Sequence, residues 1–136
     1  MSQLKMILLA LLFVAPSAHA FRDAKVHLEI QALKGSLIKE QSLQQRIVLV
    51  EKFKSFIDHY LQNVVIENSD RGREEFASLN EFEMALFTIK VNEKNPATTC
   101  RSSSAQIRSE GTLPEEKNTL APSATQTLEI LSLLCR

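Results

Sequence analysis

Residues 36–66 read SLIKEQSLQQRIVLVEKFKSFIDHYLQNVVI and carry the clearest periodic pattern of the chain. Apolar side chains recur at intervals of three and four, which places them on one face of an α-helix. A second apolar row widens this face beyond the narrow seam of a coiled coil, and Lys54 interrupts the first row. The two rows are Leu43, Ile47, Val50, Ile57, Leu61 and Val64, and Leu49, Phe53, Phe56 and Tyr60. We therefore predict one long helix over 36–66 at the centre of a helical bundle.

The residues on the N-terminal side of this stretch predict a shorter helix. The whole chain has three glycines and four prolines in 136 residues, and such sparse punctuation favours helices over many short strands. We expect a helix from about Asp23 to Lys34, with Gly35 as the break before the long helix. The alternation of apolar and polar residues over 26–32 is also typical of a strand, so that alternative stays open.

A third helix is predicted on the C-terminal side. Ser78 and Glu81 have the spacing of a capping box, although the helix could already begin at Arg73. Its end is expected near 92–95, because a proline disfavours helical geometry in the residue before it, and Pro96 follows. Residues 87–91 alternate again, so a strand is the alternative for them.

The C-terminal part combines a polar segment with a final apolar helix. Residues 92–127 hold eleven Ser or Thr and eight apolar residues, too few to offset the ordering entropy of the segment. A helix is expected from Pro122, because proline suits a first helical turn and apolar residues follow on one face. Cys100 and Cys135 are the two cysteines of the chain, and we expect a structural disulfide between them. The polar segment would then be a loop stapled onto a mainly α bundle of three to four helices.

The first 20 residues have the pattern of a signal peptide. Lys5 precedes an apolar run over 6–15, and small residues at Ala18 and Ala20 match a signal-peptidase site. A helical run of ten residues reaches about 15 Å, roughly half of a bilayer core, so a membrane anchor is disfavoured. We expect cleavage after Ala20, export to the periplasm or the exterior, no stable membrane insertion afterwards, and a single helical domain over 21–136.

Charge and motif content exclude several classes of function. Sixteen basic and sixteen acidic residues give a net charge of zero, without the excess positive charge that nucleic-acid binding requires. His27 and His59 are the histidines of the expected mature chain, and no His-x-x-x-His or Cys-x-x-Cys pair marks a metal or haem site. We therefore expect no metal and no cofactor. A small hydrolytic enzyme that uses His59 and nearby acids remains an alternative.

Aromatic residues are the remaining candidates for a working surface. They could line a groove for a protein partner or an apolar ligand, although aromatic rows more often form a core. The candidates are Phe53, Phe56, Tyr60, Phe82 and Phe87. We expect a small exported helical protein that acts by binding. A structural homodimer that buries the apolar face of 43–64 against its own copy is a further alternative.

Overall fold

The fold is a bundle of five helices, seen in a computed structural model that describes residues 23–64, 68–116 and 118–136. These residues contain no strand beyond the isolated bridge between Thr112 and Leu120. The helices are α2 (Ala24–Lys39), α3 (Leu43–Asn63), α4 (Asp70–Phe87), α5 (Pro96–Gly111) and α6 (Pro122–Leu134). The prediction of a mainly α protein is confirmed, although the described residues form five helices rather than the three to four predicted. The predicted signal peptide over 1–20 lies outside the described residues.

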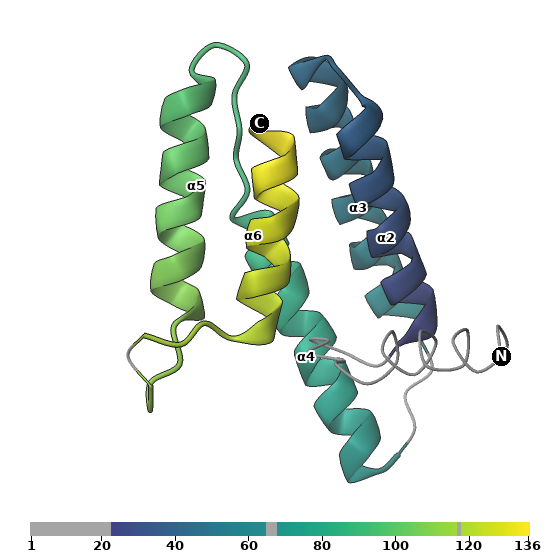
Figure 1. Cartoon of the computed structure of the whole chain (residues 1–136). Coiled ribbons are helices and arrows are strands. Elements are labelled where there is room, and N and C mark those ends of the chain that lie inside the picture. Colours follow the sequence, from purple (N-terminus) through teal and green to yellow (C-terminus); the bar gives the residue numbers. More distant parts are fainter. Residues whose placement is uncertain (1–22, 65–67, 117) are drawn as a thin grey trace, which may run out of the picture.

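The central helix of the bundle is α6, which packs against each of the other four helices (Figure 1). This corrects the prediction that the stretch 36–66 supplies the central helix. Both apolar and small polar residues of α6 are buried, so it can accept neighbours on several sides. They are Ser123, Ala124, Thr127, Ile130, Leu131 and Leu134. Of the apolar face predicted after Pro122, Leu131 and Leu134 are buried and Leu128 and Cys135 are partly buried.

Helices α2 and α3 are separated at residues 40–42, not at Gly35. The apolar spacing of α2 continues through Gly35 to Leu37, which is fully buried. Burial of that side chain offsets the roughly 1 kcal/mol that a glycine costs inside a helix. Ser42 then starts α3, since its hydroxyl accepts a hydrogen bond from the Gln45 N–H at 3.4 Å. The single helix predicted over 36–66 is therefore wrong, and the open choice over 26–32 resolves to helix.

Helix α4 begins earlier and ends earlier than predicted. The Ser69 hydroxyl caps it by accepting from the Gly72 N–H at 3.0 Å, so neither Arg73 nor Ser78 is the start. The helix ends at Phe87, and residues 88–91 form neither helix nor strand. Ile89 in this segment is 1% exposed, so an apolar residue of the alternating pattern is buried in the core without belonging to a strand.

The largest correction concerns the polar segment, because it contains helix α5. This helix buries two side chains, Ser103 and Ile107, and Pro96 occupies its first turn. The disulfide between Cys100 and Cys135 is present, with a Cα–Cα distance of 6.3 Å, and joins α5 to the end of α6. Figure 1 shows the two helices running side by side in opposite directions. The predicted staple is thus confirmed, but it holds a helix rather than a loop.

Basic side chains cap the C-terminal ends of three helices. No described residue, glycine included, has a positive φ, so none of these helices ends in the usual left-handed cap. Lys54 donates to the Ile89 carbonyl oxygen at 2.5 Å, just after α4. Arg46 donates to the Leu134 carbonyl oxygen at 3.0 Å at the end of α6, and Arg136 donates to the Leu37 carbonyl oxygen at 2.8 Å in α2. A positive charge near a helix C-terminus is also favoured by the helix dipole.

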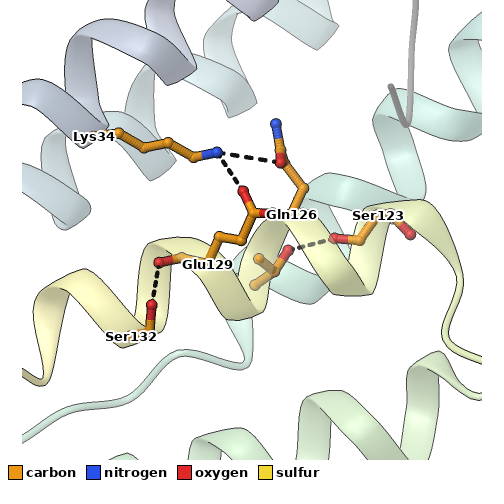
Figure 2. Close-up of polar contacts among 6 residues, drawn as sticks. Lys34, Ser123, Gln126, Glu129 and Ser132 are labelled. Atoms are coloured by element: carbon orange, nitrogen blue, oxygen red, sulfur yellow. Dashed lines mark hydrogen bonds and ion pairs between the residues drawn. The ribbon is translucent and has the colours of Figure 1, made fainter. Parts of the chain in front are cut away.

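Polar contacts along the outside of the bundle tie α2 to α6. Figure 2 shows the Lys34 ammonium group between Gln126 and Glu129, with an ion pair to the Glu129 carboxylate.

The Thr127 hydroxyl is buried and donates to the Ser123 carbonyl oxygen at 2.8 Å, so it has a partner inside its own helix. Within the described ranges, no helix is long and apolar enough to cross a membrane.

Two of the three helical glycines, Gly35 and Gly111, should respond oppositely to alanine. A Cβ atom at Gly111 would clash with Ala124 of α6, whereas a Cβ at Gly35 would meet nothing within 4 Å. Gly111→Ala is therefore expected to lower the free energy of unfolding by about 1–3 kcal/mol, because α5 and α6 must move apart. Gly35→Ala is expected to raise it by about 0.5–1 kcal/mol. Urea denaturation of both variants checks this pair, and an equal effect in both would contradict the close α5–α6 contact.

Candidate functional site

A cavity of about 320 Å³ lies where α4, α5 and α6 meet the loop over 112–121. Residues at the end of α5 and the start of α6 line it, and Figure 1 shows these two helix ends at the bottom of α5 and α6. Its floor includes Ile107 and Ala124, each 2% exposed. Two other hollows, over α3 and residues 90–94, are lined by no buried residue. The first cavity is therefore the one of the three that reaches the core, and it falls within the size range of small-molecule sites, roughly 300–1,000 Å³.

The lining is largely apolar, and the cavity opens to solvent along one side. The opening is marked by four exposed lining residues, among them Met84 at 64% exposure. Of the described residues that line the cavity, the charged ones are both acids, Glu81 on α4 and Glu110 at the end of α5. The lining residues are Glu81, Met84, Ala85, Ile107, Glu110, Gly111, Thr112, Leu113, Pro114, Ala121, Ser123 and Ala124.

Backbone hydrogen bonds hold the loop that closes the cavity. The Leu113 N–H donates to the Thr119 carbonyl oxygen at 2.9 Å, and the Ala121 N–H donates to the Gly111 carbonyl oxygen at 2.7 Å. The Thr112 hydroxyl donates to the Arg108 carbonyl oxygen at 2.6 Å and so extends the end of α5. These bonds fix the loop against the end of α5 and the start of α6.

Four of the five predicted aromatic residues pack together, three of them on α3 and Phe82 on α4. The rings of Phe53 and Phe82 lie 6.2 Å apart between centroids, and these residues are 6% and 0% exposed. Phe56 and Tyr60 stack at 5.8 Å and are partly buried. Phe87 stands apart at 48% exposure, with the Lys54 ammonium 5.9 Å from its ring centroid. None of the five lines the cavity, and Phe53 and Phe82 serve the core.

Tyr60 has a structural partner at the start of α2. Its hydroxyl donates to the Asp23 carboxylate, which also caps α2 by accepting from the Val26 N–H at 3.1 Å. Burial, this hydrogen bond and the negative charges of Asp23 and Glu75 raise the pKa of Tyr60 to about 12. The phenol therefore stays protonated and links the end of α3 to the start of α2.

His59 lies on the exposed side of α3, and its partner there is Asn63, one turn along the helix. The Asn63 amide donates to the His59 carbonyl oxygen at 2.7 Å and lies 3.4 Å from the ring Nδ1. No group of three His, Cys, Asp or Glu residues that could hold a metal ion occurs within 23–64, 68–116 and 118–136. The hydrogen bonds described for His59 are to Asn63 and not to a carboxylate, and His59 lines none of the three hollows described.

Two acids from adjacent helices, Asp58 of α3 and Glu83 of α4, face each other. Glu83 Oε2 is buried and has no hydrogen-bond donor among the described residues. Burial, together with the charge of Asp58 and a hydrogen bond to it, raises the pKa of Glu83 above its ordinary value. The two carboxylates lack a shared donor when both are ionised, whereas a protonated Glu83 can donate to Asp58.

Glu83→Gln should stabilise the protein at neutral pH. A raised pKa in the folded state means that the folded state binds the proton more tightly, so this group favours folding increasingly as pH falls through that pKa. Glutamine donates to Asp58 at every pH and carries no charge. Thermal melts followed by circular dichroism should show a higher Tm for the variant at pH 7 and a smaller difference at pH 4. Glu74→Gln, on the exposed side of the same helix, is the control, and a pH-independent difference would contradict the pairing.

The sequence prediction missed most of the cavity, because its residues fall in the segment expected to be a loop. Two signals could have indicated a helix there. Pro96 and Gly111 stand at positions typical of a helix start and a helix end, and Ser103 and Ile107 have an i, i+4 spacing. The abundance of serine and threonine concealed this pattern.

Comparison of the chain with known protein families, with curated proteins and with solved structures finds no match.

Proposed function

We propose that this protein is an exported binding protein that takes an apolar ligand into the cavity between α4, α5 and α6. The observation that carries the proposal is the cavity itself, which is largely apolar and open to solvent beside Met84. Small-molecule sites have this character, with a few polar groups that fix the orientation of the ligand. Binding is preferred to catalysis because the charged lining residues described are two exposed acids at the opening, and no histidine, lysine or cysteine among the described residues lines the cavity with them.

The alternative of a structural homodimer has less support. It was expected to bury the apolar face of 43–64 against a second copy of the chain. Within one chain, α2, α4 and α6 already pack against α3, and Val50 and Ile57 are at most 1% exposed. A second copy is not needed to cover that face.

Export is part of the proposal. It is supported by the signal-peptide pattern over 1–20 and by the disulfide, which persists in oxidising compartments. Mass spectrometry of protein recovered from the periplasm of a bacterial host should give a chain that begins at Phe21 and lacks the two thiol hydrogens. A chain that retains Met1 and stays in the cytoplasm would overturn this part.

Filling the cavity should abolish ligand binding without unfolding the protein. Ala85 lines the cavity from α4, so Ala85→Leu places three further carbon atoms in it. Ala105→Leu adds the same bulk on the exposed side of α5 and is the matched control. Titration calorimetry with 1-octanol should show binding to the wild type and to A105L, and at least tenfold weaker binding to A85L. Equal binding to both variants would place the site elsewhere, and no binding to the wild type would overturn the proposal.

A further inference from the structure

The charge at the opening points to the class of ligand. Glu81 and Glu110 are exposed, come from different helices and flank a lining that is otherwise uncharged over its described residues. The Gln106 amide donates to Glu110 Oε1 at 3.0 Å, which orients that carboxylate without neutralising it. A ligand whose apolar part enters the cavity would have its outer end beside these two carboxylates.

We propose that the ligand is an organic cation with an apolar tail, whose positive end lies beside Glu81 and Glu110. This inference rests on the proposed function and adds the sign of the ligand's charge. An anionic amphiphile, such as a fatty acid, would bring a third negative charge to the opening, and the described lining offers no basic side chain to receive it.

The loop beside the opening does not supply a clear excess of positive charge. Glu115 and Glu116 are exposed in it, and its one basic residue, Lys117, lies outside the described residues. By sequence the loop is therefore net acidic, like the opening itself. Exposed charges act weakly through water, so the preference for a cation should be modest in size and should fall with added salt.

Three probes of equal chain length separate charge from apolar burial. Octylammonium, 1-octanol and octanoate are cationic, neutral and anionic at pH 7, and calorimetry at low salt compares them on the full chain with its disulfide intact. We expect octylammonium to bind roughly fivefold more tightly than 1-octanol, and octanoate to bind least tightly. In the Glu81→Gln, Glu110→Gln double variant, both substitutions lie on exposed side chains, and the ratio of octylammonium affinity to 1-octanol affinity should fall from roughly fivefold to about one.

The outcomes distinguish this inference from the proposed function. Equal binding of all three probes, weakened by A85L, would overturn the cation preference and leave the cavity as the binding site. Tightest binding of octanoate, or a cation preference that survives in the double variant, would also overturn the inference. Absence of binding by every probe would overturn both proposals.

Discussion

Replacement of Cys100 and Cys135 by serine is expected to lower the free energy of unfolding by about 3–4 kcal/mol. The bridge closes a loop between positions 35 apart in the sequence, and removing that closure enlarges the entropy of the unfolded chain. The loss should be uneven. Helix α5 buries only Ser103 and Ile107, and its main helical neighbour is α6, so it depends on the bridge more than α3 does.

Hydrogen exchange measures this difference directly. In the double serine variant, amides of 96–111 should lose more protection than amides of 43–63. Wild-type protein reduced with dithiothreitol should behave in the same way and is the control for the substitutions themselves. An equal loss of protection in both helices would show that the bridge stabilises the whole bundle rather than holding α5.

Arg46→Met is the second substitution with a large expected effect, a loss of about 3 kcal/mol. Arg46 is 6% exposed, and its guanidinium donates to four carbonyl oxygens at two helix ends. These are the oxygens of Leu134 at 3.0 Å, Arg136 at 3.1 Å, Glu40 at 3.0 Å and Gln41 at 2.8 Å. Methionine keeps the apolar stem but leaves these carbonyl oxygens without their charged donor. Most of the expected loss of stability comes from these unsatisfied acceptors.

Two comparisons define the origin of the effect. Arg101→Met removes an exposed arginine of α5 and should change stability by less than about 0.5 kcal/mol. Arg46→Lys should recover only part of the loss, because one ammonium group cannot reproduce the planar fork that serves both helix ends. Urea denaturation gives the three values, and a cost for Arg46→Met no greater than for Arg101→Met would contradict the capping role.

The sequence predicted best those parts of the fold where apolar spacing is regular. Regular apolar spacing indicated which faces of α3 and α6 are apolar. The presence of two cysteines in the sequence indicated the pairing of Cys100 with Cys135. Helix limits were predicted less well, because Gly35 suggested a break that the burial of Leu37 overrides. Ser42 and Gln45 have the spacing of a capping box, but they stand inside a continuous apolar pattern, and Ser69 acts as a cap without such a partner.

The candidate site could not be predicted, for two physical reasons. Helix α5 has little apolar surface of its own and is held by α6 and the disulfide, so its local pattern is limited to its two ends and to the i, i+4 spacing of Ser103 and Ile107. The cavity also depends on close approach at Gly111 and Ala124, a contact between residues that only the packing of α5 on α6 brings together. The aromatic rows gave a strong signal, but Phe53 and Phe82 mark the core.

The most direct test of the central claim is to map where a bound probe lies. A titration of isotope-labelled protein with octylammonium, followed by nuclear magnetic resonance, reports the position of the ligand residue by residue. We expect the largest shifts at cavity residues, among them Met84, Ile107 and Ala124, and none of that size in A85L. Largest shifts on the exposed face of α2 at Leu28 and Ile38, or around Phe87, would contradict the assignment of the cavity as the binding site.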